Sequence, residues 1–167
     1  LNIGARQTRL DGFKTFDLDP HTDPDFLGNA DDLSRFAAGS VQEILASNVL
    51  EHLSHRVTLI ALKEWHRVLV PGGKLWLSVP DFAVVMRLYP LGGLSEYLVN
   101  LLWGEQESAF AYHHVCFTWA NLRELLDKAG FKSANRVPQL PFGLNDASSL
   151  CDALTGLPTA INVEATA

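Results

Sequence analysis

The sequence predicts an α/β fold, in which a mostly parallel sheet carries helices on both faces. Short apolar or alternating segments typical of strands recur along the chain, and segments with helical spacing separate the later ones. A connection through a helix returns the next strand parallel to the first. In open sheets of this kind ligands bind beyond the carboxyl ends of the strands, so the residues that follow each strand are the candidates for a site.

The composition is that of one globular domain covering residues 1–167. Hydrophobic residues make up 47% of the chain, which is enough apolar material for a core. The net charge of −6 argues against nucleic acid, and no apolar run is long enough to cross a bilayer, so we expect neither nucleic acid nor membrane as a partner. Cys116 and Cys151 lack the spacing of a disulfide or metal pair, and we expect them to be buried thiols of a cytoplasmic protein.

The first half of the chain contains four predicted strands. Residues 1–5 form a short apolar strand, and residues 14–20 alternate between apolar and polar positions up to a proline. Residues 26–27 are long enough only for a minimal strand, and residues 41–47 have an apolar centre. One helical turn is expected between the last two strands, at residues 34–38.

The second half of the chain alternates helices and strands. Ser54 is expected to cap a helix that Pro71-Gly72-Gly73 ends. Residues 74–80 are apolar along most of their length, as expected of a central strand. The remaining predicted elements are helices at residues 82–89, 94–102 and 118–130, and strands at residues 131–137 and 161–167.

Small or polar residues follow three of the predicted strands. Gly4 follows the first strand and lets a ligand approach the backbone closely. Asp17 can accept both hydroxyls of an adenosine ribose, although a solvated acidic turn explains it equally well. Ser47 and Asn48 leave the fourth strand and would face the reacting end of a cofactor.

The polar segment at residues 28–33 has the right character to wrap the edge of an adenine. Backbone N–H groups of Ala30 or Asp31 would meet the ring nitrogens, and Asp31 or Asp32 would accept the exocyclic amine. Capping of the turn at Ser34 is an alternative role for Asp32.

Glu51, His52 and His55 lie close together in the sequence, as metal ligands often do. Zinc sites need three or four well-placed ligands, however, and the order Glu-His-x-x-His shows no evident third ligand. We therefore expect no metal here. His52 is interpreted first as a residue at the start of a helix and second as a substrate contact.

Six segments follow one another in an order typical of one large family. They are LNIGA, FDLDP, GNADDLSRFAAGSVQEILASNVLEHL, EWHRVLVPGGKLWLSVPD, FTWANLRELLDKAGF and INVEATA. This order resembles the class I S-adenosylmethionine-dependent methyltransferases, and most of all their small-molecule group, often labelled type 11. The resemblance implies a three-layer Rossmann-like sandwich whose mostly parallel, seven-stranded sheet has an antiparallel C-terminal strand.

The same resemblance implies S-adenosylmethionine as the cofactor and a small molecule as the methyl acceptor. The implied cofactor-binding residues are Gly4 and Ala5 under the methionine part, Asp17 at the ribose with Leu18 next to it, Ala30, Asp31 and Asp32 at the adenine, and Ser47 and Asn48 beside the methionine part. The chain would then act as an enzyme, a transferase that moves a methyl group in line from a sulfonium to a nucleophile. Much of the acceleration in such a reaction can come from positioning the two reactants.

Residues 82–117 would form a lid or acceptor-binding insertion in this family. If the acceptor must lose a proton, His113 and His114 are the candidate bases, with Tyr112 and Trp103 as apolar walls. For either histidine alone, packing or a hydrogen bond to the cap of the following helix is the alternative role.

The chain departs from the family in its first loop. The family usually has a Gly-x-Gly-x-Gly loop that starts a helix, whereas Gly4 here is followed by Ala5-Arg6-Gln7-Thr8, and only about eight residues separate it from Phe13. A nicotinamide-dependent dehydrogenase needs that loop and helix for its pyrophosphate, so the departure disfavours this rival class most. A binding module that kept the fold and lost the cofactor remains the alternative to an enzyme.

Overall fold

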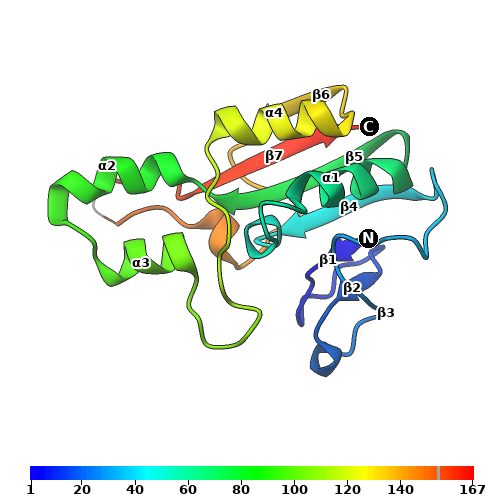
Figure 1. Ribbon diagram of the computed structural model, residues 1–167, viewed down its shortest axis with the longest axis horizontal. Coiled ribbons are helices and arrows are strands. Elements are labelled where there is room, and N and C mark those ends of the chain that lie inside the picture. The colour runs from blue at the N-terminus through cyan, green and yellow to red at the C-terminus, as the bar shows by residue number, and fades with distance from the viewer. Residues whose placement is uncertain (154) are drawn as a thin grey trace.

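The computed structural model describes residues 1–153 and 155–167, which form a mixed seven-stranded sheet (Figure 1). The strand order is β3-β2-β1-β4-β5-β7-β6, and β7 runs antiparallel to both β5 and β6, whereas the other neighbours are parallel. The strands are β1 (Asn2–Ile3), β2 (Thr15–Asp17), β3 (Phe26–Leu27), β4 (Val41–Ser47), β5 (Leu69–Pro80), β6 (Ser133–Arg136) and β7 (Ala160–Thr166). The predicted sheet, with its antiparallel C-terminal strand, is confirmed.

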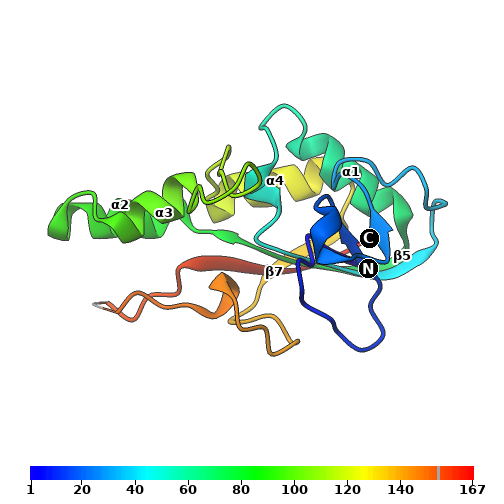
Figure 2. The ribbon, with the colours of Figure 1, turned by 90° about the horizontal axis from the view of Figure 1, so that it is seen from below.

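The four α-helices all lie on one side of the sheet (Figure 2). They are α1 (Thr58–Val68), α2 (Phe82–Gly92), α3 (Glu96–Trp103) and α4 (Trp119–Ala129). On the other side the described residues form loops and the short 3-10 helix η3 (Ala147–Ser149), in place of the full helices expected there. Two further 3-10 helices are η1 (Pro20–Thr22) and η2 (Leu50–His52).

The sheet is amphipathic, which explains this one-sided arrangement. Leu75, Leu77 and Val163 face the helices and belong to one buried apolar core. The alternate positions carry polar partners across the same strands, such as Ser78 opposite Asn162. Because side chains alternate between the two faces of a strand, the second face has little apolar surface for a layer of helices to bury. The expectation of a strand that is apolar along most of residues 74–80 did not include this alternation.

Helix α1 differs from its predicted limits at both ends. It begins at Thr58 rather than directly after Ser54, whose carbonyl nevertheless accepts the Thr58 N–H. It ends at Val68, and the Pro71-Gly72-Gly73 turn lies inside β5, where the pairing with β4 shifts register. The extra residues of β5 form an irregularity of the β-bulge type, which sequence periodicity does not reveal.

Of the other expectations from the sequence, some are confirmed and some are wrong. Thr118 and Asn121 form the capping box of α4, as a helix beginning after Thr118 requires. Residues 34–38 form turns instead of the expected helical turn. Cys116 and Cys151 are exposed, so their interpretation as buried thiols is wrong. Among the described residues, no helix has both the length and the apolar character that a bilayer span requires.

Helices α2 and α3 pack against each other and extend beyond the end of the sheet (Figures 1 and 2). Val84, Val85, Leu88 and Leu98 form their shared core, which is separate from the main one. The outward surfaces of this pair remain apolar, since Met86, Tyr89 and Leu91 are exposed. The pair therefore stands beside the carboxyl end of β5 as a small unit with its own packing.

Candidate functional site

The carboxyl ends of three neighbouring strands meet at one edge of the sheet. Ile3 of β1 pairs with Phe16 of β2 on one side and with Ala46 of β4 on the other. The next residue of each strand is Gly4, Asp17 or Ser47, so the fold brings these three predicted positions together. This is the edge at which open parallel sheets bind their ligands.

Asp17 organises the loops around this edge. Its side chain is 8% exposed, its Oδ2 accepts the backbone N–H of Arg6 at 2.7 Å, and its Oδ1 accepts that of Asp19 at 3.0 Å. The backbone carbonyl of Asp17 also accepts the N–H of Gly28 at 2.9 Å. A carboxylate has about four lone-pair sites, so both oxygens keep capacity for a further donor such as a ribose hydroxyl.

Gly4 has a packing role that the sequence did not reveal. Its φ of +63° lies in the left-handed region, and an added Cβ would stand 2.5 Å from Cγ2 of Val49. Glycine is therefore required here by backbone conformation and by a neighbouring side chain. Ala5 beside it is buried, whereas Leu18 is exposed next to Asp17.

Replacement of Gly4 by alanine is expected to destabilise the protein more than the same change at Gly12. Both glycines have positive φ, which costs an L-residue about 1–2 kcal/mol. An alanine at position 12 has open space around it, whereas at position 4 it meets Val49, which adds about 1 kcal/mol of overpacking. Urea denaturation of both variants measures the difference, and equal losses would contradict the packing role.

The predicted adenine segment, residues 28–33, is hydrogen-bonded to a side chain of helix α1. The carbonyl of Ala30 accepts the indole N–H of the fully buried Trp65 at 2.7 Å. Asp31 is half-buried, and Asp32 is exposed with its Oδ1 accepting the N–H of Ser34 at 2.9 Å. Asp32 thus makes the capping contact that was its alternative role, and adenine binding by this segment stays a prediction.

Replacement of Trp65 by phenylalanine is expected to lower the free energy of unfolding by about 1–3 kcal/mol. The variant removes the indole donor to the carbonyl of the half-buried Ala30, which costs about 0.5–1.5 kcal/mol, and the smaller ring leaves a cavity at the fully buried position 65. Trp103 is 46% exposed, and its change to phenylalanine should stay within about 0.5 kcal/mol of the parent. Chemical denaturation compares the two, and a neutral Trp65→Phe would refute the anchoring role.

Ser47 and Asn48 meet a residue from a distant segment. The hydroxyl of Ser47 donates to Oδ2 of Asp146 at 2.7 Å, and the amide of Asn48 donates to Oγ of Ser47 at 3.2 Å. Asp146 also caps η3 by accepting the N–H of Ser148. Asp146 was not among the predicted site residues, although an aspartate two residues before a serine pair is a recognisable cap. The connection between β6 and β7 therefore reaches the edge where the methionine part of the cofactor is expected.

Glu51, His52 and His113 form a cluster beside this edge. One potential ligand atom from each residue lies within 4.8 Å of the others, and the two imidazole rings contact edge to face with centroids 4.8 Å apart. Burial raises the pKa of the Glu51 carboxyl to about 8 and lowers that of His52 to about 4, with a smaller contribution from His113 to the latter. Burial likewise lowers the pKa of His113. Both histidines are candidates by sequence, but only the structure shows that they are in contact.

His114 differs from its neighbour in the chain. Its side chain is exposed, and its backbone N–H donates to the carbonyl of Glu51 at 2.7 Å. The hydroxyl and backbone N–H that cap α4 are those of Thr118 and Asn121, so capping of that helix is not the role of either histidine. Of the two candidate bases, His113 is the one that lies half-buried against His52.

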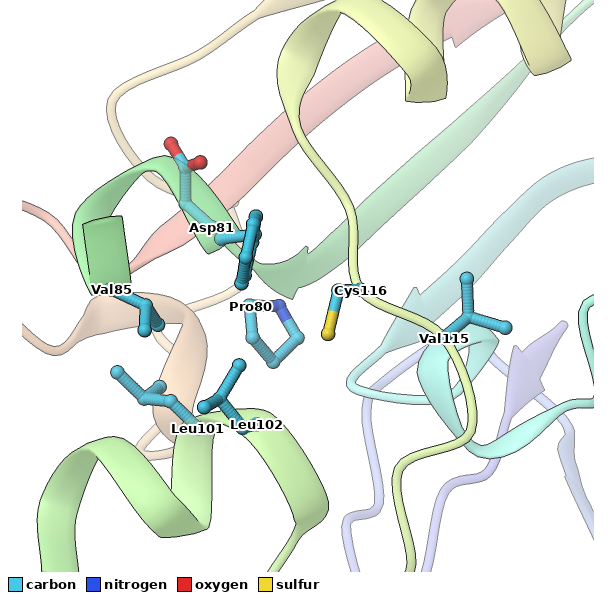
Figure 3. A pocket seen from close by; sticks show the side chains of 8 residues that line it. Pro80, Asp81, Val85, Leu101, Leu102, Val115 and Cys116 are labelled. Carbon is cyan, nitrogen blue, oxygen red and sulfur yellow. The ribbon is translucent and has the colours of Figure 1, made fainter. Parts of the chain in front are cut away.

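An apolar cleft lies where β5 meets the α2–α3 pair (Figure 3). Figure 3 shows Leu101, Leu102 and Cys116 facing the same space beside Pro80, while the Asp81 carboxylate points away. The full lining is Pro80, Asp81, Phe82, Val85, Leu101, Leu102, Val115 and Cys116. Val115 in this lining lies two residues after His113, so one segment contributes to both the cleft and the histidine cluster.

The comparisons with known proteins agree with this geometry. Residues 13–77 match a family model described as a methyltransferase domain. A S-adenosylmethionine-dependent methyltransferase of Thermotoga maritima, described as a possible histamine N-methyltransferase, superposes with a TM-score of 0.64 at 19% identity, covering 99% of this chain and 80% of that one. One from Methanosarcina mazei has a TM-score of 0.61 at 17% identity, covering 99% and 90%. No curated protein matches the chain.

A third similar structure contains S-adenosylhomocysteine. The methyltransferase CalH in complex with S-adenosylhomocysteine superposes with a TM-score of 0.57 at 17% identity, covering 99% of this chain and 50% of that one. The chain therefore has the fold of the S-adenosylmethionine-dependent methyltransferases, as the resemblance implied.

Proposed function

We propose that this protein transfers the methyl group of S-adenosylmethionine to a small-molecule acceptor. The observation that carries the proposal is the position of Asp17, a buried carboxylate at the carboxyl end of β2 in a sheet with the methyltransferase strand order. The adenosine would lie across the ends of β1 and β2, with its ribose hydroxyls on Asp17 and its adenine against Ala30, Asp31 and Asp32. CalH, which has this fold, binds S-adenosylhomocysteine.

The methionine part would lie over Gly4 and Ala5 and beside Ser47 and Asn48. Its carboxylate needs a cationic or N–H partner, and the first loop has no helix N-terminus to supply one. Arg6 is close enough to the cluster for its charge to contribute to the lowered pKa of His52. Arg6 is exposed and follows the buried Ala5, so its guanidinium is the group that we assign to the methionine carboxylate.

The acceptor would enter through the insertion at residues 82–117. The cleft in Figure 3 has a volume of about 10 Å³, so it would have to widen to admit an acceptor. Its walls from β5, α2 and α3 are mainly apolar, which favours an acceptor with an apolar part. In the reaction the bond from sulfur to the methyl carbon breaks as the acceptor forms its own bond to that carbon. The proton of the acceptor would pass to His113, which is neutral at pH 7 because its pKa is lowered. His114 would serve as the exposed alternative.

A specific observation favours a second candidate, a binding module that no longer transfers methyl groups. The connection between β1 and β2 is a loop throughout residues 4–14, and Asp146 already accepts the hydroxyl of Ser47. In this reading the fold persists as a scaffold with a reduced affinity for the cofactor.

Isothermal titration calorimetry with S-adenosylmethionine and S-adenosylhomocysteine separates the two candidates. The enzyme proposal expects saturable binding of both compounds by the folded protein. No heat at high micromolar cofactor, with the fold verified by circular dichroism, would refute the enzyme and favour the binding module. Because calorimetry needs no acceptor, the result does not depend on first identifying one.

A further inference from the structure

The carboxylate of Glu51 is the most unusual polar group in the described part of the chain. It is 1% exposed, and no other described residue donates a hydrogen bond to either of its oxygens; only the backbone N–H of Glu51 itself acts on the carboxyl. A buried carboxylate with no partner is costly, and buried carboxylates normally pair with a cation or coordinate a metal. The backbone carbonyl of Glu51 accepts the N–H of His114, which fixes the segment that bears His113 close to it.

Both histidines of the cluster are oriented as metal ligands usually are. Nδ1 of His52 lies 3.0 Å from the carbonyl oxygen of Tyr112, and Nδ1 of His113 lies 3.1 Å from that of Leu101. A carbonyl oxygen only accepts, so each Nδ1 carries the proton and each Nε2 keeps its lone pair. Metal-binding histidines almost always make such a bond through their second ring nitrogen, which fixes the tautomer and the direction of the ring.

The charges around the cluster favour a cation. The carboxylate of Asp146 acts electrostatically on Glu51, and that of Glu105 acts on His113. On the opposite side, Arg6 and His114 act on His52, and Arg6 is the permanent positive charge among them. Two carboxylates therefore oppose one guanidinium around the cluster, and Glu51 would add a third negative charge when a bound ion displaces its proton.

We propose that Glu51, His52 and His113 bind a divalent transition-metal ion of the zinc class. Two histidines and one glutamate are a ligand set that catalytic zinc sites use, with a fourth position open to water or substrate. Tetrahedral zinc with bonds of about 2.1 Å places its ligand atoms about 3.4 Å apart, so the present limit of 4.8 Å requires a closure of up to about 1.4 Å by side-chain rotation. His52 and His113 are only partly buried, which allows that rotation and gives the ion an entry path.

The site explains a pattern that the sequence alone could not. Glu51 and His52 are adjacent in η2, whereas His113 comes from the loop after α3. The sequence pattern places His55 beside the Glu-His pair and predicts no metal, and His55 is exposed and outside the cluster.

Asp146 accepts the hydroxyl of Ser47 and also acts electrostatically on Glu51, so the ion would lie near the edge that carries Ser47. An ion on Nε2 of His113 would leave His114 as the base of the proposed transfer. Metal binding itself does not depend on whether the chain transfers methyl groups.

The test uses the whole chain, stripped of metal with a chelator and then titrated with Zn²⁺ or Co²⁺. Equilibrium dialysis with elemental analysis gives stoichiometry and affinity, and the visible absorption of Co²⁺ reports the coordination geometry without any activity assay. The proposal expects about one ion per chain. Glu51→Gln, His52→Ala and His113→Ala should each weaken binding more than about 100-fold, the upper end of what loss of a supporting partner costs.

His55→Ala is the matched control, because it removes an exposed histidine three residues from His52. Its affinity should equal that of the parent, and circular dichroism verifies the fold of every variant. Absence of saturable binding by the folded parent overturns the proposal. Binding that survives both Glu51→Gln and His113→Ala, or that is lost in His55→Ala, also overturns it, because the ion would then lie elsewhere. His52→Ala and His113→Ala change partly exposed side chains, so the test holds even if Glu51→Gln fails to fold.

Discussion

Replacement of Glu51 by glutamine is expected to leave stability nearly unchanged at pH 5 and to raise it by about 3–4 kcal/mol at pH 8.5 in metal-free protein. Burial raises the pKa of this carboxyl from 4.5 to about 8. Between pH 4.5 and about pH 8 the folded protein keeps a proton on Glu51 that the unfolded chain has released. Stability therefore falls as the pH rises toward 8, by about 1.4 kcal/mol per pH unit. Glutamine does not titrate, so the variant does not lose stability in this way as the pH rises.

Urea unfolding across the pH range, with a chelator present, measures the difference between parent and variant. This comparison is necessary because His52 and His113, whose pKa values are lowered, change stability in the opposite direction below about pH 6.5. Glu124→Gln is the control, since that carboxylate is exposed on α4 beside Lys128. Parallel pH profiles for the parent and Glu51→Gln would contradict the assignment of a buried, protonated carboxyl.

Replacement of Asp17 by alanine is expected to weaken S-adenosylmethionine binding by about 1.5–3 kcal/mol, which is about a 10- to 150-fold loss in affinity. The carboxylate would lose its bonds to the ribose hydroxyls. The backbone N–H groups of Arg6 and Asp19 would lose their acceptor as well, so the first loop should also become less ordered. Calorimetry measures the affinity, and amide hydrogen exchange of residues 5–14 reports the loop.

Asp17→Asn separates these two effects. The amide keeps one oxygen as an acceptor and retains the side-chain volume, so it should preserve more of the loop than alanine does while still losing the charge-assisted bond to the ribose. Asp11→Asn changes an exposed aspartate of the same loop and should leave affinity unchanged. An affinity that is equal in the parent and in Asp17→Ala would refute the assignment of Asp17 to the ribose.

Much of the fold could be predicted from local patterns. The apolar segment at β4, the Thr118 cap of α4 and the alternation of β7 are short-range signals, and each of these three elements appears close to its expected limits. The errors arose where long-range pairing overrides local preference. The Pro71-Gly72-Gly73 turn is an ordinary helix stop by sequence, yet it lies inside β5 because that strand pairs with β4 on both sides of the irregularity.

Some residues of the candidate site could likewise be named from local sequence, and others could not. The order of the segments in the sequence was sufficient to name Asp17 and Ser47, because a residue that follows a parallel strand always lies at the same edge of the sheet. Gly4 was named for the same reason, but its contact with Val49 depends on the packing of a loop that sequence does not specify. Asp146 was missed because 99 residues separate it from Ser47.

By itself the sequence determined the class of fold and the strand ends that carry polar groups, since hydrophobic periodicity and turn residues act over a few positions of the chain. Only the tertiary structure decided which face of the sheet is covered by helices and which distant side chains meet. Glu51 is an ordinary acidic residue until burial removes it from water and His113, 62 positions away, reaches it from another loop. Such contacts depend on how loops close around a core, and local sequence carries little information about that closure.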